Sequence, residues 1–355
     1  MFMSNANTHL HAPSMVLPAE WAPQSAIQLT WPHAQTDWKP YLEAISRTFV
    51  EIANAITNVE DVIIATPHPE DVARQLAEQL TAGQLARVRF CHCETDDTWA
   101  RDHGVITLAA ADGMLTHLDF RFNGWGEKFE SAADNRINRQ LKAAGLLPGM
   151  LETHDDFVLE GGSIESDGHG TIFTTSQCLL APRRNQPLTQ SQIETELMRR
   201  LHARRIVWLD HGNLIGDDTD GHIDTIVRIA PADTLLYMTV GDPSDPQYDD
   251  FQALEAQLRT LKTIEGTPYR LLPLPCPAPI YDGDDRLPAT YANFLVLNGA
   301  VLVPTYGQPS LDHEAMNTIA EAFPSREIIG IDARTIIRQH GSIHCLTMQI
   351  PTSSK

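Results

Sequence analysis

The sequence predicts an α/β protein, because helical and strand patterns alternate along the chain and polar clusters recur between them. Helical periodicity is clearest over residues 38–58, where Ile45, Phe49 and Ile52 fall on one face. Further helices are predicted at about 69–81, 189–204, 247–262 and 312–323. The β-rich runs between helices often come in pairs, which favours hairpins.

Short β-rich runs are predicted to form the strands. The run "FLVLNGAVLVPTYG" contains Asn298-Gly299, a strong two-residue hairpin turn signal. The other predicted strands are "DVIIAT", "VRFCHC", "GVITLAA", "MLTHLDFRF", "GTIFTT", "RIVWL", "TIVRIA", "TLLYMTV", "EIIGID" and "CLTMQIP".

Five polar clusters recur at broadly similar spacing. They lie near residues 102, 160, 222, 293 and 345, about 58, 62, 71 and 52 residues apart. Each interval can hold one small unit of strands and a helix, and five units around an axis would bring the clusters together. Other α/β proteins have loops at a similar frequency, so the spacing alone leaves the repeat open.

Composition excludes some classes of function. The 355 residues, 42% of them hydrophobic, suffice for one large domain or two. A net charge of −20 disfavours nucleic-acid binding, which needs a basic face. It suits a cationic substrate, although an acidic surface also serves solubility. Residues 1–12 are predicted to form a flexible tail. Neither a signal peptide nor an apolar run of about 18 residues is visible, so no membrane association is predicted.

The cysteines indicate a reduced protein. Cys91, Cys93, Cys178, Cys276 and Cys345 are odd in number and widely spread, which argues against a disulfide framework and favours a cytoplasmic location. The "CHC" segment is weak evidence for zinc, which usually takes two separated ligand pairs. Its alternation instead predicts two cysteines buried in a strand.

Two acidic motifs are candidate binding elements. In "DDTWARDHG", the Asp102 carboxylate could accept paired hydrogen bonds from a guanidinium beside Trp99, or Arg101 could form an internal salt bridge next to a core tryptophan. In "LEGGSIES", Glu160 precedes two glycines that permit close backbone approach. Taken alone, Glu160 is better interpreted as a surface residue in a turn.

The segment "GDDTDGHIDTIVRIA" combines an imidazole with several carboxylates. If it begins a strand, His222 and Asp224 share one face, as a general acid–base and its partner would. The acidic residues Asp217, Asp218 and Asp220 also suggest Ca²⁺. However, no Glu closes the loop in the EF-hand pattern, so no metal is predicted.

The segment "GSIHCLTM" places His344 beside Cys345. If residues 343–350 form a strand, these neighbours point to opposite faces, so the base for the thiol comes from elsewhere. A free thiol with a pKa of about 8.5 needs such a partner to be a nucleophile. We favour His222 for this role and expect His344 to pack or hydrogen-bond on the other face.

Taken together, the motifs resemble the agmatine deiminase and Porphyromonas-type peptidylarginine deiminase family of guanidine-modifying enzymes. The resemblance covers nearly the whole chain and rests on an ordered series of motifs. These are residues 17–38, "DDTWARDHG", "FNGWGEKF", "LEGGSIESDGHGTIFTT", "DHGNLIGDDTDGHID", "YANFLVLNGAVLVPTYG" and "GSIHCLTMQIP". It implies a pentein fold: a five-bladed, pseudo-symmetric α/β propeller of ββαβ units around the active site, as one domain over residues 13–355.

The resemblance also implies roles for individual residues. Cys345 matches the nucleophile, His222 the general acid–base, and Asp224 and Asp102 the carboxylates that bind the guanidinium. Residues implied to line the substrate pocket are Glu160, Trp99 and Asp220. Where many agmatine deiminases have a glycine run, this chain has Gln339-His340 before Gly341, so the loop near the substrate tail is expected to differ.

The implied activity is hydrolysis of a guanidino group through a covalent Cys345 thiouronium, without metal or organic cofactor. Agmatine, a small cationic guanidine, is the favoured substrate and would yield N-carbamoylputrescine and ammonia in polyamine synthesis. Free or peptidyl arginine is the alternative. Amidino transfer and non-catalytic guanidine binding are less favoured. The residues leave open whether the chain forms a homo-oligomer.

Overall fold

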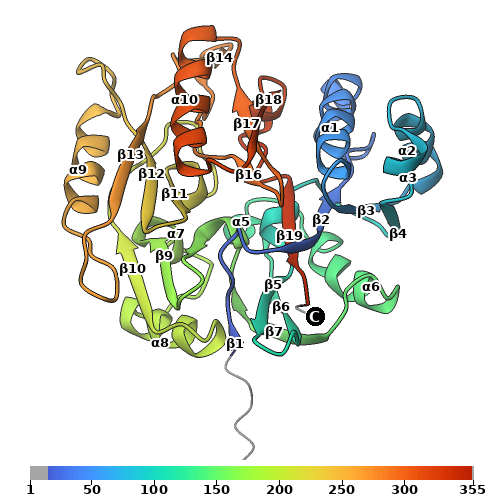
Figure 1. The fold of residues 1–355 in the computed structure, drawn as a ribbon, viewed down its shortest axis with the longest axis horizontal. Coiled ribbons are helices and arrows are strands. Elements are labelled where there is room, and N and C mark those ends of the chain that lie inside the picture. Colours follow the sequence, from blue (N-terminus) through green and yellow to red (C-terminus); the bar gives the residue numbers. More distant parts are fainter. Residues whose placement is uncertain (1–14, 354–355) are drawn as a thin grey trace, which may run out of the picture.

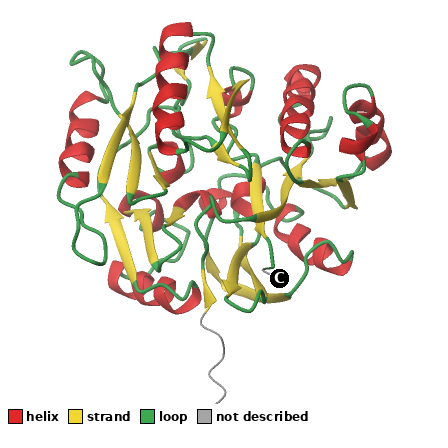
Figure 2. Cartoon of the chain, viewed as in Figure 1, coloured by secondary structure: helices red, strands yellow, loops and turns green. Residues whose placement is uncertain are grey.

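The structure, a computed structural model, describes residues 15–353. Over this range the strands form five small sheets of three or four strands and a separate two-stranded hairpin. The longer helices lie around the outside of the molecule, whereas most strands and several short helices lie further in (Figures 1 and 2). The α/β prediction is therefore confirmed. The predicted tail over residues 1–12 lies outside the described residues, and the single domain over residues 13–355 stays a prediction.

The same unit recurs in each of the five sheets: an antiparallel strand pair, then a helix, then a strand parallel to the second of the pair. The antiparallel pairs are β5 (Ile106–Ala110) with β6 (Leu115–Arg121), β8 (Ile164–Ser166) with β9 (Thr171–Thr175), β11 (Val227–Ala230) with β12 (Thr234–Met238), β16 (Leu295–Val296) with β17 (Ala300–Thr305), and β19 (Thr347–Pro351) with β2 (Gln24–Thr30). The helices are α6 (Ile137–Ala143), α8 (Gln190–Arg200), α9 (Tyr248–Leu258), α10 (Pro309–Ala322) and α1 (Leu42–Thr57). The parallel strands are β7 (Met150–Val158), β10 (Arg205–Leu209), β13 (Arg270–Leu274), β18 (Glu327–Asp332) and β3 (Asp61–Thr66).

Shorter elements complete the fold. The remaining strands are β1 (Met15–Val16), β4 (Val88–His92), β14 (Tyr281–Asp282) and β15 (Asp285–Arg286). The remaining α-helices are α2 (Pro69–Ala77), α3 (Ala82–Leu85), α4 (Ala100–His103), α5 (Gly124–Glu127) and α7 (Ser176–Leu179). Single 3₁₀ turns are η1 (Lys39–Tyr41), η2 (Asp134–Arg136), η3 (Gly161–Ser163), η4 (Ile223–Thr225) and η5 (Ile336–Gln339).

The five polar clusters occupy equivalent positions in the five units. Each lies just before the first strand of its antiparallel pair. The clusters and the strands they precede are Asp102 before β5, Glu160 before β8, His222 before β11, Asn293 before β16 and Cys345 before β19. The spacing noted in the sequence therefore reflects the recurrence of one structural unit.

Two strand predictions near these clusters are wrong at their starting points. Residues 223–225 form the 3₁₀ turn η4, which His222 precedes, and the strand begins only at Val227. Likewise, β19 begins at Thr347, so residues 343–346 form a turn. Strand alternation therefore fixes neither the His222–Asp224 pair nor the His344–Cys345 pair.

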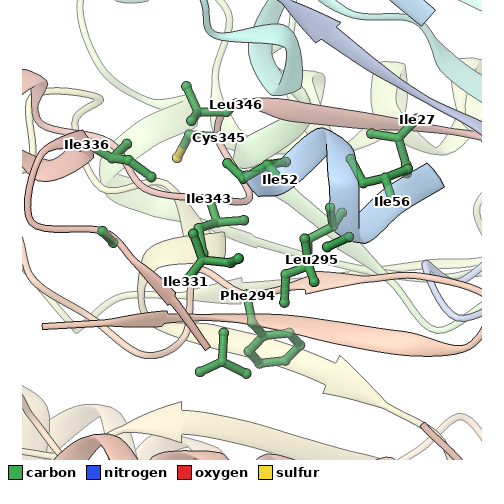
Figure 3. Close-up of a cluster of buried hydrophobic side chains, with 14 of the residues drawn as sticks. Ile27, Ile52, Ile56, Phe294, Leu295, Ile331, Ile336, Ile343, Cys345 and Leu346 are labelled. Carbon is green, nitrogen blue, oxygen red and sulfur yellow. The ribbon is translucent and has the colours of Figure 1, made fainter. Parts of the chain in front are cut away.

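Apolar packing between α1 and the sheets supports the segment that carries Cys345. Ile45, Phe49 and Ile52 of α1 are fully buried, as their helical spacing predicts. In Figure 3, Ile52 lies close to Ile343 and Cys345 within one cluster of buried side chains. The chain around the candidate nucleophile is thus anchored in the core. Within residues 15–353, no helix combines the length and the apolar character needed to cross a membrane.

Candidate active site

Cys345 lies at the wall of a cavity of about 220 Å³ and is itself 3% exposed. The turn before β19 positions its side chain there. The cavity walls are strongly acidic and aromatic. They are formed by Asp37, Asp97, Trp99, Asp102, Trp125, Phe129, Asp218, Thr219, Gln339, His340, Gly341 and Cys345.

The thiol of Cys345 has two polar neighbours. Asn293 Oδ1 accepts hydrogen bonds from the Cys345 backbone amide (3.2 Å) and from Sγ (3.4 Å). Asp224 Oδ2 lies 3.9 Å from Sγ. Burial, followed by the charges of Asp224 and Asp102, raises the pKa of the Cys345 thiol well above its usual value. Without a cation in the cavity, the thiol is therefore protonated at neutral pH.

One carboxylate oxygen of Asp224 has no hydrogen-bond partner among the described residues. Its Oδ2 atom lies 2.6 Å from Nδ1 of His344, while its Oδ1 atom is buried without a hydrogen-bond partner among residues 15–353. Burial opposes ionisation, but the hydrogen bond and charge of His344 outweigh it and lower the pKa of Asp224. A buried, ionised oxygen without a partner is a ready acceptor for a cationic donor.

Asp102 lies within the short helix α4 and is fixed by two donors. The Gly162 amide donates to its Oδ1 (3.1 Å), and the Trp125 indole donates to its Oδ2 (3.0 Å). Burial raises the pKa of Asp102 to about 6, although the nearby His222 acts to lower it. The carboxylate is thus ionised above about pH 6 and held in one orientation.

His222 is a buried imidazole that lies 3.6 Å (Nδ1) from Asp102 Oδ1. Neither ring nitrogen has a hydrogen-bond partner within the described part of the chain. Burial alone would lower the pKa of His222, but the charge of Asp102 and then the neighbouring Cys178 raise it well above its usual value. His222 is therefore an imidazolium whose protons are available to a ligand.

The site depends on close approach of the backbone at Gly162. A Cβ atom there would lie 2.6 Å from His222 Nδ1, 2.8 Å from Asp102 Oδ1 and 3.1 Å from Asp224 Oδ2. These separations are too short for any side chain. The close backbone approach proposed for the "LEGGS" glycines is thus observed, and it brings three site residues together.

The remaining predicted pocket residues differ in position. Trp99 lines the cavity, and its indole donates to Asp97 Oδ2 (3.0 Å). Glu160 is fully buried rather than at the surface, and it pairs with Arg184 at 3.0 Å. Asp220 pairs with Lys128 (2.8 Å) and Arg184 (2.7 Å). Glu160 and Asp220 are thus in ion pairs and, like His222 and Asp224, are not among the residues of the cavity wall given above. Their substrate-binding role stays a prediction.

Contacts within the protein also explain the placement of Arg101, Asp217 and the two neighbouring cysteines Cys91 and Cys93. Arg101 donates to Gln349 Oε1 (2.6 Å), and within residues 15–353 it forms no salt bridge of the kind suggested from the sequence. Asp217 accepts hydrogen bonds from Thr219 and Gly221 of its own loop, which explains an acidic residue there without Ca²⁺. The structure contains five free cysteines, and Cys91 and Cys93 are buried in the core as predicted.

Sequence reasoning assigned no role to two residues that the structure places at the site. Asn293 contacts the nucleophile, and Trp125 contacts Asp102. Both lie in motifs noticed in the sequence, "YANF" and "FNGWGEKF", but neither motif indicates which side chain faces the cavity. Trp125 also has a left-handed backbone (φ 55°), which a periodicity pattern does not predict.

Comparison with known proteins identifies the family. A profile of the Porphyromonas-type peptidyl-arginine deiminase family matches residues 16–351. The chain is 33% identical to the agmatine deiminase of Stutzerimonas stutzeri, covering 94% of this chain and 95% of that protein.

Two solved structures extend the similarity. The structure of a Porphyromonas gingivalis protein described as a putative arginine deiminase superposes with a TM-score of 0.89 at 48% identity, covering 95% of this chain and 98% of that one. A cysteine-to-serine variant of C. jejuni agmatine deiminase with substrate bound has a TM-score of 0.89 at 35% identity, covering 98% and 100%. This chain belongs to the Porphyromonas-type peptidyl-arginine deiminase family.

Proposed function

We propose that this protein is an agmatine deiminase, which hydrolyses agmatine to N-carbamoylputrescine and ammonia. The observation that carries the proposal is a set of buried polar atoms without partners in two residues of the site. They are Oδ1 of Asp224, whose other oxygen lies 3.9 Å from Cys345 Sγ, and both ring nitrogens of His222, which lies 3.6 Å from Asp102. A planar guanidinium supplies donors for the carboxylates and a carbon for the thiolate to attack. Relatives described as agmatine deiminases support the same substrate.

Substrate binding generates the nucleophile in this mechanism. The guanidinium binds between Asp102 and Asp224, whose negative charges otherwise keep the Cys345 thiol protonated. Its positive charge offsets theirs, so the thiol loses its proton to solvent as the substrate binds. The thiolate then attacks the guanidinium carbon and forms a neutral tetrahedral intermediate.

His222 then transfers protons in both directions. Its imidazolium protonates one substrate nitrogen, which leaves as ammonia, and the carbon stays bound to sulfur as a thiouronium. The neutral imidazole next takes a proton from water, whose oxygen attacks the same carbon. As the C–S bond breaks, the hydroxyl proton of this intermediate passes to the Cys345 sulfur, which releases the neutral ureido product and restores the thiol. The departing ammonia takes up the proton that the thiol lost to solvent at the start and becomes ammonium.

The outer part of the cavity favours agmatine over arginine. Besides Asp102, its walls carry the carboxyl groups of Asp37, Asp97 and Asp218, and the described residues that line it include neither Lys nor Arg. Burial raises the pKa of Asp97 to about 7 and that of Asp218 to about 6. A substrate amine would be stabilised by these groups, whereas the carboxylate of free arginine would be repelled.

One observation keeps peptidyl arginine as the second candidate. A wider acidic groove of about 970 Å³ adjoins the cavity and shares four wall residues with it, Asp37, Asp97, Trp125 and Phe129. A longer chain attached to the guanidine could extend into this groove.

A substrate panel tests the proposal. The purified protein is incubated separately with agmatine, free arginine and an arginine-containing peptide, and ammonia and ureido product are measured. We expect the highest kcat/KM with agmatine and stoichiometric products. Preferential turnover of the peptide would favour the second candidate. Absence of ammonia from all three substrates would contradict the deiminase function.

We also propose that the five units are the blades of a pseudo-symmetric propeller around this site. The equivalent positions of Asp102, Glu160, His222, Asn293 and Cys345 in their units support this arrangement. A cytoplasmic location is proposed from the five free cysteines.

A further inference from the structure

His344 bridges two carboxylates in the interior. It is 1% exposed, and its Nδ1 lies 2.6 Å from Asp224 Oδ2 while its Nε2 lies 2.8 Å from Glu20 Oε2. Nε2 also lies 3.1 Å from Arg228 Nη2, but that nitrogen donates to the same Glu20 oxygen. Because carboxylates only accept hydrogen bonds, the contacts with Asp224 and Glu20 make both ring nitrogens of His344 donors. The side chain is therefore an imidazolium that links Asp224 of the site to Glu20, more than 200 residues earlier in the chain.

Glu20 is itself held firmly. Its Oε1 accepts a hydrogen bond from the Val296 amide (2.7 Å), and its Oε2 also accepts from Arg228. Arg228 is fixed in turn by Glu165, at 2.6 Å from its Nε. Because Glu20 has little freedom to move, it anchors the far side of the His344 ring.

His344 does not contact the substrate cavity. It is not among that cavity's wall residues, although its neighbour Cys345 is. Instead it lines a separate small cavity with Glu20, Arg101 and Glu165. Both of its ring nitrogens contact carboxylates, Asp224 and Glu20, so His344 is coupled to the site through Asp224.

The contact with His344 decides which oxygen of Asp224 faces the substrate. His344 occupies Oδ2, so Oδ1 is left as the unpaired acceptor described above. A buried carboxylate with only one partner needs a compensating charge to stay ionised, and the His344 imidazolium supplies it. Loss of that charge would leave Asp224 free to rotate and easier to protonate.

We propose that His344 is a positioning residue, which Glu20 holds against Asp224 so that the free oxygen of Asp224 is ionised and directed at the guanidinium. This inference rests on the proposed deiminase function. It assigns a role to the neighbour of the nucleophile that is distinct from acid–base catalysis.

His344→Gln is the direct test, because glutamine can donate one hydrogen bond but carries no charge. We expect KM for the substrate to rise at least about tenfold, the scale of one lost charge-assisted hydrogen bond. The acid limb of the kcat/KM profile should also move to higher pH, because Asp224 must lose its proton to bind the cation and would do so less readily. The charged or titratable groups around the Asp224–His344 pair are Glu20, Arg101, Asp102, Glu165, His222, Arg228 and Cys345.

His117→Gln is the matched control. His117 is also a fully buried histidine with both nitrogens bonded, to Thr107 Oγ1 (2.8 Å) and to the Pro148 carbonyl, but it lies in β6 away from the cavity. This variant should keep the wild-type KM and pH profile. Glu20→Gln gives an independent test should His344→Gln fail to fold, and it should shift the acid limb in the same direction.

The readouts separate this inference from the proposed function. All variants are assayed with whichever panel substrate the wild type turns over, so failure of agmatine as substrate leaves the comparison intact. Binding of agmatine and of guanidinium is also measured by calorimetry in the Cys345→Ser background, which needs no turnover. If folded His344→Gln and Glu20→Gln keep the wild-type affinity and acid limb, His344 is structural only and the inference is overturned.

Discussion

Oδ2 of Asp224 lies 3.9 Å from the Sγ atom of Cys345, and both side chains are buried. In the proposed mechanism, the carboxylate that binds the substrate cation therefore also keeps the Cys345 thiol protonated until that cation arrives. The contact between Asp224 and Cys345 thus links substrate binding to activation of the thiol. In the free protein, little of Cys345 is present as thiolate.

Asp224→Asn should make the thiol more reactive while it abolishes deimination. The substitution removes a negative charge that raises the pKa of Cys345, so more thiolate exists at neutral pH. The rate of alkylation by iodoacetamide at pH 7 should rise severalfold, measured at Cys345 by peptide mass spectrometry. An unchanged or slower rate would show that Asp224 does not hold the thiol protonated.

Gly162→Ala should greatly reduce activity. The added methyl would lie 2.6 Å from His222 Nδ1 and 2.8 Å from Asp102 Oδ1, so both side chains must shift. Displacements of about 1 Å at a catalytic site cost on the order of a hundredfold in rate. The control is Gly83→Ala, whose nearest neighbour to the new Cβ is 4.0 Å away, and it should keep full activity. Comparable kcat/KM for the two variants would contradict the packing described for Gly162.

Asp102→Asn should weaken guanidine binding and alter the pH profile. Loss of a charge-assisted hydrogen bond costs about 1.5–3 kcal/mol, equivalent to roughly a 10- to 150-fold loss in kcat/KM. Asp102 also raises the pKa of His222, so the basic limb should move to lower pH as the imidazolium loses its proton sooner. The profile is measured by ammonia release across pH. A small rise in KM alone, with turnover unchanged, would place Asp102 outside the reaction.

Asp97→Asn should stabilise the protein at alkaline pH. Burial raises the pKa of Asp97 from 3.8 to about 7, so its ionisation is unfavourable in the folded state. The contribution of protonated Asp97 to the free energy of unfolding is fully present below about pH 4. It is lost as the pH rises through 7, where Asp97 ionises in the folded protein. The gain at pH 8 is at most about 4 kcal/mol, because one pKa unit corresponds to about 1.4 kcal/mol.

Urea unfolding at pH 5 and pH 8 measures this difference. The asparagine keeps a side-chain oxygen for the Thr98 amide, which donates to Asp97 in the folded protein. Asp284→Asn, at an exposed position, is the control and should change stability little at either pH. A larger stabilisation by Asp97→Asn at pH 5 than at pH 8 would reverse the expected sign.

The sequence predicts most helices and the hairpins because these depend on local patterns. The Asn298-Gly299 turn is confirmed, with the Leu297 amide donating to the Ala300 carbonyl at 2.8 Å. Strand β7 escapes prediction because much of "MLETHDDFV" faces solvent and shows no apolar pattern. Strand β13, "RLLPL", contains a proline that argues against a strand.

The site is less predictable because side-chain direction near it does not follow a regular period. His222 and Asp224 flank or occupy a 3₁₀ turn, and His344 and Cys345 lie in a turn before β19. Periodicity therefore predicted opposite faces for the last two, whereas both approach Oδ2 of Asp224. The ion pair of Glu160 with Arg184 joins residues from different motifs, so no local pattern indicates it.

Ammonia release by Cys345→Ser tests the central claim most directly. Serine preserves the size of the side chain but is a far weaker nucleophile at neutral pH. We expect the variant to bind agmatine and unfold like the wild type, with turnover reduced below detection and no covalent adduct by mass spectrometry. Near-normal ammonia release from the folded variant would contradict covalent catalysis by Cys345.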